Sequence, residues 1–247
     1  MPYTVLGAGS NVLVRSGGVR GAVIFLNRAF SGITLIDDHH LDVGAGVLDK
    51  KVAKVACEHG IGGLEFLYTI PGTIGGAVRM NAGAYGRETN DLVVYAIVMD
   101  PKGRIHRLST EELGLGHRTC AVPSDWIVLS VRLKGEPRPP AEIQDEMERL
   151  TAQRRATQPS GKTGGSTFKN PLEQSTKKAW QLIREAGCAD MRVGDASLSD
   201  VHANFMMNNG AATAEDLETL GERVREQVQE KTGVLLEWEI HRLGEPA

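Results

Sequence analysis

A six-residue segment, Gly135-Glu136-Pro137-Arg138-Pro139-Pro140, constrains the architecture of this 247-residue chain most strongly. Three prolines in six residues disrupt regular secondary structure, because proline fixes φ and lacks a backbone donor. Short β-rich runs separated by glycines precede the segment, whereas helical periodicity follows it. The sequence therefore predicts an α+β chain of two domains, residues 1–136 and residues 141–233.

The first part alternates short strands with one helix. Strands are expected over residues 4–6, 12–14, 22–26, 33–36, 92–99, 104–108 and 126–133. A helix is expected over residues 47–59, because four apolar residues share one stripe and Gly60 follows it. Asp100-Pro101-Lys102-Gly103 predicts a hairpin turn between two strands.

The second part is helical. Apolar stripes predict helices around residues 143–150, 179–186 and 217–228, and the last begins with Thr213 and Asp216 at capping-box spacing. The tail returns to β character, so we expect residues 234–247 to contribute a strand to the first domain.

Composition excludes several classes of protein. The chain has 28 basic and 31 acidic residues and a net charge of −3, which argues against a nucleic-acid partner. Its three cysteines form no Cys-x-x-Cys pair, so neither a disulfide framework nor a metal site is expected. No apolar run is long enough to span a membrane, and the opening residues lack the pattern of a secretion signal. We therefore expect a cytoplasmic protein without membrane association.

Two glycine-rich segments stand out among the 29 glycines of the chain. Residues 6–14 read Leu-Gly-Ala-Gly-Ser-Asn-Val-Leu-Val, and residues 70–86 contain five glycines and little charge. Backbone without side chains can approach a phosphate or a flat ring closely. For the first segment alone a tight hairpin is the favoured explanation, whereas for the second a ligand contact and a structural turn cluster are equally supported. The first is not a dinucleotide-binding fingerprint, because Val12 replaces its third glycine and a strand follows.

A third motif, Gly164-Gly165-Ser166-Thr167-Phe168-Lys169-Asn170-Pro171, places a hydroxyl between glycines and a Lys-Asn pair. It is not a phosphate-binding P-loop, because Ala156 stands at the required glycine, and Ser166 lacks a nucleophile elbow. Arg154 and Arg155 either clamp a phosphate or form a solvated helix end. Leu236-Glu237-Trp238-Glu239-Ile240 alternates as a strand. For His202 and Asn204 we favour a structural role.

Taken in order, five motifs resemble those of the UDP-N-acetylenolpyruvoylglucosamine reductases (MurB), of the second type, over essentially the whole chain. They are Leu-Gly-Ala-Gly-Ser-Asn, the loop from Ile-Pro-Gly to Asn-Ala-Gly-Ala-Tyr-Gly, Gly-His-Arg at 116–118, Gly-Gly-Ser-Thr-Phe-Lys-Asn-Pro and Leu-Glu-Trp-Glu-Ile. The resemblance implies a vanillyl-alcohol-oxidase-type FAD-binding domain followed by an α+β substrate-binding domain.

The resemblance also implies an activity. FAD, reduced by NADPH, would serve to convert UDP-N-acetylglucosamine enolpyruvate into UDP-N-acetylmuramate in peptidoglycan precursor synthesis. Separately, we expect a monomer, although the sequence does not determine the oligomeric state. By motif match, Ser166 is the expected proton donor, and Arg118 and Glu239 are expected to stabilise the enol. The residues expected to bind the nucleotide sugar are Arg154, Arg155, Lys169 and Asn170. The predicted cofactor-binding residues are Gly7, Gly9, Ser10, Asn11, Pro71, Gly72, Gly75, Gly76, Asn81 and Gly83.

Three departures from the family pattern bear on these expectations. Several dozen residues that precede the Gly-Ala-Gly-Ser-Asn turn in the family are absent from this sequence, the 157–166 spacing is about one residue short, and Asp195 stands where a glycine is expected. The rival interpretations are a truncated, non-catalytic nucleotide-sugar-binding remnant and another oxidoreductase of the same flavin fold. Ser166, Arg118 and Glu239 argue against the second rival, because an oxidase needs no proton donor for an enol.

The absent residues would form much of the first flavin-binding lobe. We therefore expect the 247-residue chain to bind FAD weakly or not at all, and an upstream-extended form to purify yellow. An absorbance spectrum showing stoichiometric flavin in the 247-residue chain would contradict this expectation.

Overall fold

The computed structural model describes residues 1–247, except for the side chain of Arg28. The chain forms two compact units. Unit 1 comprises Met1–Gly9 and Gly21–Arg154, and unit 2 comprises Ser10–Arg20 and Arg155–Ala247.

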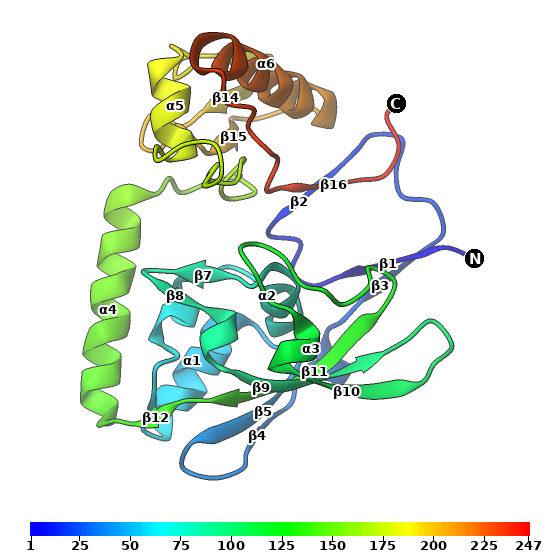
Figure 1. Cartoon of the computed structure of the whole chain (residues 1–247), viewed down its shortest axis with the longest axis vertical. Helices are drawn as coiled ribbons and strands as arrows, with labels where there is room; N and C mark the ends of the chain where they lie inside the picture. Colours follow the sequence, from blue (N-terminus) through cyan, green and yellow to red (C-terminus); the bar gives the residue numbers. More distant parts are fainter. The chain divides into compact units, whose positions relative to one another are not determined.

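Unit 1 contains most of the strands (Figure 1). Its strands are β1 (Tyr3–Leu6), β3 (Ala22–Phe25), β4 (Ile33–Leu35), β5 (His40–Gly44), β6 (Ile61–Gly62), β7 (Gly83–Ala84), β8 (Arg87–Glu88), β9 (Val93–Met99), β10 (Ile105–Ser109), β11 (Ile127–Lys134) and β12 (Glu136–Pro137). Its helices are η1 (Arg28–Phe30), α1 (Asp49–Glu58), η2 (Glu65–Thr69), α2 (Ile74–Met80), η3 (Thr89–Asp91), α3 (Thr110–Leu113) and α4 (Pro140–Thr157), whose last three residues lie in unit 2.

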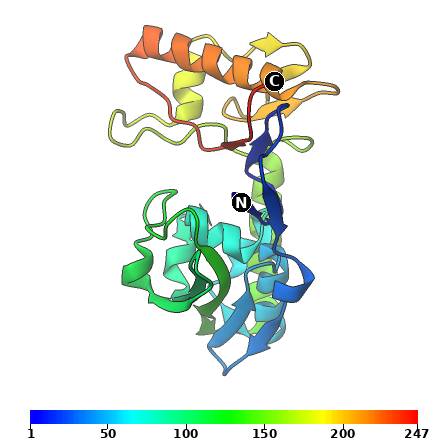
Figure 2. The same cartoon turned by 90° about the vertical axis from the view of Figure 1, so that its right-hand side faces the viewer.

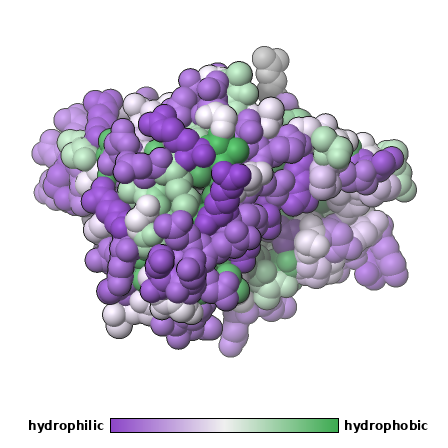
Figure 3. All heavy atoms as spheres, turned by 90° about the horizontal axis from the view of Figure 1, so that it is seen from above, coloured by the Kyte–Doolittle hydropathy of each residue, from purple (hydrophilic) through white to green (hydrophobic). Residues whose placement is uncertain are grey.

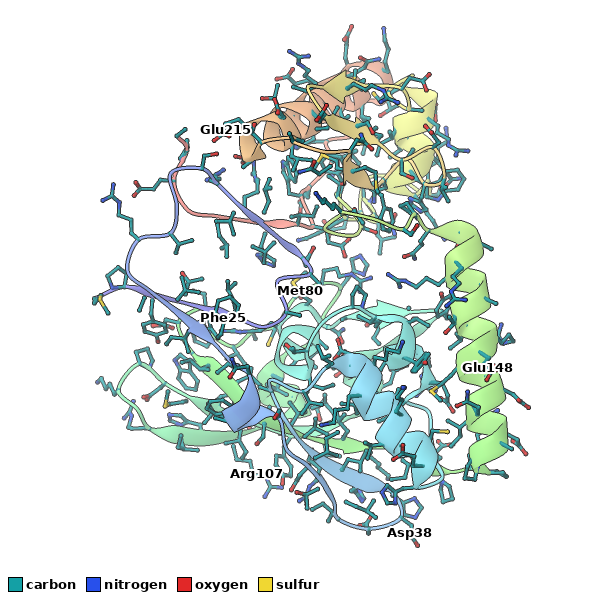
Figure 4. The ribbon with its side chains drawn as sticks, turned by 180° about the vertical axis from the view of Figure 1, so that it is seen from behind. Phe25, Asp38, Met80, Arg107, Glu148 and Glu215 are labelled. Carbon is teal, nitrogen blue, oxygen red and sulfur yellow. The ribbon has the colours of Figure 1, made fainter. Side chains whose placement is uncertain are left out.

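The centre of unit 1 is an antiparallel sheet in the order β10-β9-β11-β5-β4. Val131 of β11 lies opposite Ala96 on one side and Val43 on the other, and all three are buried. Alternation along these strands therefore gives the sheet one apolar face, against which α2 packs (Figure 2). β1 and β3 form a separate parallel pair, on which Phe25 is exposed (Figure 4).

The other face of the sheet is polar. The Tyr95 ring lies between two guanidinium groups, with the Cζ of Arg107, labelled in Figure 4, at 3.9 Å and the Cζ of Arg132 at 5.1 Å from its centroid. Arg132 also donates two hydrogen bonds to Asp42, of 2.7 and 2.6 Å. These contacts account for arginines in the middle of a β-rich region without any ligand.

The proline-rich segment is not a domain boundary. Pro137 pairs with Ile61 in the β12–β6 ladder, and Arg138 N donates to Gly60 O at 2.8 Å. Pro140 begins α4, which is the position where a helix tolerates proline best. The buried residues of α4, Ile143, Met147 and Leu150, belong to the core of unit 1. The compact units therefore separate between Arg154 and Arg155, later than predicted.

Unit 2 is a small α+β assembly. Its elements are β2 (Val12–Val14), α5 (Ala179–Glu185), β13 (Arg192–Val193), β14 (Ala196–Leu198), β15 (Met206–Asn208), α6 (Ala214–Thr232) and β16 (His241–Leu243). The two helices α5 and α6 pack together, and α6 lies against the three-stranded sheet β13-β14-β15 (Figures 1 and 2). As predicted, the Thr213 side chain caps α6, and Gly233 ends it in the left-handed region at φ +75°.

The tail forms part of unit 2. β16 pairs in parallel with β2, so residues 234–247 do join a strand from the predicted first domain, but that strand itself lies in unit 2. Leu236 and Ile240 are buried in the core of unit 2. A Cβ on Gly221 would lie 2.2 Å from the Trp238 ring, so the absence of a side chain there lets α6 accept this ring.

Most predicted elements are confirmed, and the misses are informative. The structure adds several short elements, among them β5, α2 and α3 in unit 1 and the β13-β14-β15 sheet in unit 2, where the residue pattern predicted only helices. The predicted strand at 236–240 is reduced to one isolated bridge between Phe168 and Trp238. No helix among the described residues combines the length and the apolar character needed to cross a membrane.

Candidate functional site

The two glycine-rich segments meet within unit 1. A Cβ on Gly7 would lie 2.3 Å from Thr73 Oγ1, so the first turn touches the second loop directly. The second loop is tied to the start of α1, because Asp49 N donates to Gly72 O at 3.2 Å and Ile74 N donates to Val47 O at 2.9 Å. The two segments are thus in contact at Thr73.

Two of the predicted cofactor-binding glycines have no neighbouring atom that would exclude a side chain, although the left-handed backbone of Gly9 favours glycine. Gly9 has φ +67° and no heavy atom within 4 Å of an added Cβ, and Gly76 is exposed near the start of α2. By contrast, a Cβ on Gly75 would approach Ala45 Cβ to 2.9 Å, and one on Gly83 would approach Arg87 O to 2.5 Å. Packing alone therefore explains Gly75 and Gly83, whereas Gly9 and Gly76 leave backbone open to a ligand.

These loops fit the cofactor that the sequence implies. Thr73 Oγ1 is buried and has no hydrogen-bond partner among the described residues. An unsatisfied buried hydroxyl is unfavourable, and it lies beside the open backbone where a phosphate or a ribityl hydroxyl would supply a partner. Pro71 is exposed and Gly72 half-buried at the same edge. The residues present are therefore compatible with FAD.

Asn81 differs from its prediction as a cofactor-binding residue. Its side chain is 1% exposed. Its Nδ2 donates to Glu88 Oε2 at 2.8 Å and to Gly116 O at 3.0 Å, and its Oδ1 accepts from Asn90 N at 2.9 Å. Every polar group of the amide is thus used inside unit 1, so its side chain holds the fold instead of a ligand.

Arg118 lies on a loop that α2 fixes. Its own backbone is left-handed at φ +56°, and its Nη1 donates to Asn81 O at 3.3 Å. Arg79, at the end of α2 next to Met80 (Figure 4), donates four hydrogen bonds to carbonyl groups of residues 122–126. Burial lowers the pKa of Arg79. Through these carbonyl groups the Arg79 guanidinium anchors the loop, a role that the sequence did not indicate.

In unit 2, the predicted cofactor residue Asn11 binds the predicted catalytic segment. Asn11 Nδ2 donates to Glu239 O at 3.0 Å, and His241 N donates to Asn11 O at 3.0 Å. The side-chain amide of Asn11 therefore fixes the backbone around Glu239 and differs from its predicted use toward the cofactor. Ser10 begins unit 2 and is half-buried.

Ser166 and Glu239 are joined through Thr167, which is 0% exposed. Thr167 O accepts hydrogen bonds from Glu239 N at 2.8 Å and from Ile240 N at 3.4 Å. Ser166 itself forms an isolated antiparallel bridge with Phe205 and follows Gly165, whose φ is +87°. The structure thus brings these two predicted catalytic residues onto adjoining backbone segments of unit 2, while Arg118 lies in unit 1.

The predicted substrate-binding residues divide by environment. Lys169 is half-buried and pairs with Glu237 at 3.5 Å. Asn170 Oδ1 accepts from Ala179 N at 3.1 Å, so its carbonyl oxygen is already used at the start of α5. Burial lowers the pKa of Arg154, which is half-buried at the end of unit 1, whereas Arg155 is exposed at the start of unit 2.

Asp195 has a local structural role. It lies in the turn between β13 and β14, and its Oδ2 accepts from Ala211 N at 2.9 Å. Asn209 N and Nδ2 donate to its backbone carbonyl at 3.0 and 3.1 Å. The charge that replaces the expected glycine is therefore engaged with the loop before α6.

A separate cavity of about 380 Å³ lies in unit 1, and none of the predicted site residues lines it. Arg138 and Arg149 on its wall pair with Glu65 and Glu146 at 3.1 and 2.7 Å. These two guanidinium groups are thus paired within unit 1. Among the described residues no group of three His, Cys, Asp or Glu side chains is placed to hold a metal ion.

Two protein families match this chain. Residues 1–109 match an FAD binding domain family, and residues 157–243 match the family of UDP-N-acetylenolpyruvoylglucosamine reductase C-terminal domains. Both matches agree with the order of domains that the motifs predicted.

Whole-chain relatives give the same result. The chain is 52% identical to the UDP-N-acetylenolpyruvoylglucosamine reductase of Azorhizobium caulinodans, over 100% of this chain and 79% of that protein. It is 49% identical to the reductase of Gluconobacter oxydans over 99% of this chain and 79% of the relative. The crystal structure of UDP-N-acetylenolpyruvylglucosamine reductase (MurB) from Thermus caldophilus superposes with a TM-score of 0.86 at 41% identity, over 98% of this chain and 86% of the other.

Proposed function

This chain belongs to the UDP-N-acetylenolpyruvoylglucosamine reductase (MurB) family, and on that premise we propose which of its residues carry the reaction. The protein is a flavoprotein oxidoreductase of peptidoglycan precursor synthesis that reduces UDP-N-acetylglucosamine enolpyruvate to UDP-N-acetylmuramate. We propose NADPH as its electron donor.

The hydrogen-bonded link between Ser166 and Glu239 through Thr167 carries the assignment of roles. FAD, when bound, supplies a hydride to the enolpyruvyl double bond. The carbon that bears the substrate carboxylate must then receive a proton, and Ser166 Oγ delivers it. The Arg118 guanidinium and the Glu239 carboxyl group stabilise the charge that develops on the enol.

The flavin is held by the joined glycine-rich segments of unit 1. Gly9 and Gly76 supply open backbone, Thr73 Oγ1 supplies a hydrogen-bonding group without a partner among the described residues, and Pro71 and Gly72 border them. Ser10 is proposed as a further hydrogen-bonding group. We assign the FAD-binding role to residues 1–9 and 21–136, and the substrate-binding role to unit 2.

The nucleotide-sugar diphosphate is bound by cations around Ser166. Lys169 is three residues from Ser166 and half-buried, and Arg154 and Arg155 precede the serine loop. Each is a charge-assisted donor suited to phosphate oxygens. Asn170 contributes through its amide nitrogen, since its oxygen binds Ala179 N.

The chain is proposed to act as a cytoplasmic monomer. Its three cysteines are free, as in proteins of a reducing compartment. The face in Figure 3 is mainly hydrophilic with small apolar areas, unlike an obligate interface. A dimer mass in sedimentation equilibrium would contradict the monomer.

Replacing Lys169 with alanine tests the substrate site. We expect about a tenfold weaker binding of UDP-N-acetylglucosamine enolpyruvate, because one charge-assisted hydrogen bond contributes roughly 1.5 kcal/mol. The rate of flavin reduction by NADPH should stay unchanged. Titration calorimetry and rapid-mixing absorbance measure the two quantities.

Lys177→Ala is the matched control, because Lys177 is an exposed lysine of unit 2 that also pairs with a glutamate, Glu185, at 2.6 Å. Equal substrate affinity in wild type and Lys169→Ala would remove Lys169 from the binding site. A similar loss in Lys177→Ala would assign the effect to net charge alone.

A further inference from the structure

The side chain of Asn204 replaces a missing strand partner beside Ser166. Asn204 is 4% exposed. Its Nδ2 donates to Phe168 O at 2.8 Å and its Oδ1 accepts from Phe168 N at 3.0 Å. Both polar ends of one amide thus pair with both backbone groups of one residue, as a neighbouring β-strand would do.

The backbone of the same loop continues this pairing. Asn204 O accepts from Thr167 N at 2.8 Å, and Met206 N donates to Thr167 Oγ1 at 3.1 Å. The segment that begins at Ser166 is therefore bound along one side by residues 204–206.

The segment that carries Glu239 binds the opposite side. Glu239 N donates to Thr167 O, and Lys169 N donates to Glu237 O, both at 2.8 Å. The Phe168 ring also packs on Trp238, with centroids 5.2 Å apart. Residues 167–168 are thus the common support of the serine and the glutamate, and the Asn204 amide is what satisfies Phe168 on the other side.

We infer that Asn204 is a positioning residue for proton delivery, because it holds residues 166–168 in the geometry that the Ser166 hydroxyl and the Glu239 carboxyl group require. The inference rests on the roles proposed for those two residues. Misplacement of a reacting group by about 1 Å lowers a rate by about 10²-fold. The amide therefore contributes to the reaction without contact with the substrate.

Asn204→Asp is the sharpest variant. The aspartate has nearly the same shape and still accepts from Phe168 N, but it presents a carboxylate oxygen to Phe168 O, which also only accepts. In the FAD-loaded protein, we expect reoxidation of the reduced flavin by UDP-N-acetylglucosamine enolpyruvate to slow about 10- to 100-fold. Flavin reduction by NADPH should stay within about twofold of wild type.

A double-mutant cycle separates positioning from general loss of structure. If Asn204 acts through the serine, Asn204→Asp should slow reoxidation little further in a Ser166→Ala background, because the two changes disable one step. If Asn204→Asp slows reoxidation by the same factor in the Ser166→Ala background as in wild type, the inference is overturned. Hydrogen exchange gives a readout independent of activity, and the Thr167 and Phe168 amides should exchange faster in Asn204→Asp.

Gln227→Ala is the matched control, since Gln227 Nε2 donates to a backbone carbonyl of unit 2, Ala186 O, at 2.7 Å away from the serine segment. It should leave reoxidation unchanged. Should Asn204→Asp fail to fold, Asn204→Ser keeps one small hydrogen-bonding group and is expected to give a smaller loss in the same step.

The outcomes distinguish the inference from its premise. Reoxidation at the wild-type rate in Ser166→Ala would contradict the proposed function itself. Slow reoxidation in Ser166→Ala combined with normal reoxidation in folded Asn204→Asp and Asn204→Ser would contradict only the role of Asn204.

Discussion

Ser166→Ala should slow reoxidation of the reduced flavin by the enolpyruvyl substrate ~10²- to 10⁴-fold while leaving flavin reduction by NADPH near the wild-type rate. Loss of a positioned proton donor costs roughly 3 to 5 kcal/mol of activation free energy. Flavin reduction needs no proton from a serine, so the effect is confined to one half of the reaction. Anaerobic rapid mixing of the FAD-loaded protein measures both halves separately.

The hydrogen bonds that hold the backbone around Ser166 should remain intact in Ser166→Ala. Thr167, Phe168 and Asn204 hold the segment through backbone and amide groups, and none of those hydrogen bonds uses the serine hydroxyl. Ser160→Ala, an exposed serine of the preceding loop, is the control and should behave as wild type. Product formation at the wild-type rate in Ser166→Ala would reduce Ser166 to a structural turn residue.

Periodicity was sufficient to predict three of the helices of this fold. The stripes around residues 143–150, 179–186 and 217–228 became α4, α5 and α6, because a helix must bury one face in either unit. The Asp100–Gly103 turn is also confirmed, with Gly103 at φ +79° and Gly103 N bonded to Asp100 O. Local signals decide such features, so one sequence is enough to read them.

The wrong predictions of the domain boundaries concern segments whose structure depends on long-range contacts. Prolines 137, 139 and 140 indicated a linker, but a strand pair with β6 and the first turn of α4 both accommodate proline. Residues 10–20 read as part of the first domain, yet β2 pairs with β16 from the far end of the chain. No local pattern reports such a pairing, so the division into units could not be read from composition.

In the candidate site, too, local motifs were recognised from the sequence, whereas long-range supporting contacts were not. The motifs pointed to Ser166, Arg118 and Glu239, which remain the proposed catalytic residues. The supports of these residues were missed or given another role: Arg79 was not noticed, and Asn11 and Asn81 were assigned to the cofactor. Each uses its side chain on backbone groups distant in sequence, an arrangement visible only in three dimensions. For Asn204, the structural role favoured from the sequence is confirmed.

In the wild-type protein, the free energy of unfolding should fall as the pH rises from about 4 to about 8, and Asp49→Asn should remove this fall. Asp49 is the first residue of α1, is 1% exposed, and neither of its carboxylate oxygens has a hydrogen-bond partner among the described residues. Burial raises the pKa of Asp49 from its ordinary 3.8 to about 8. Between these values the unfolded chain has released a proton that the folded chain retains. The free energy of unfolding therefore falls by about 1.4 kcal/mol per pH unit.

The size of the effect follows from the width of that interval. At pH 7 the accumulated loss is on the order of 4 kcal/mol, and it vanishes below the unfolded pKa. Asparagine cannot ionise, so Asp49→Asn should be more stable than wild type at pH 7 to 8. At pH 4 it should be equal or slightly less stable, because the buried amide still lacks partners. Urea unfolding at several pH values, followed by hydrogen exchange of the α1 amides, measures the difference.

Asp100→Asn gives the opposite sign and serves as the control. Burial by itself would raise the pKa of Asp100, but hydrogen bonds from Arg104, His106 and Lys102 lower the pKa below its ordinary value. The stability that these bonds contribute is present at neutral pH and is lost as the pH falls toward the folded pKa. Asp100→Asn should therefore destabilise unit 1 at pH 7, where Asp49→Asn stabilises it. A wild-type stability that stays flat from pH 5 to pH 8, or an Asp49→Asn variant that loses stability at pH 8, would show that Asp49 ionises normally in the folded chain.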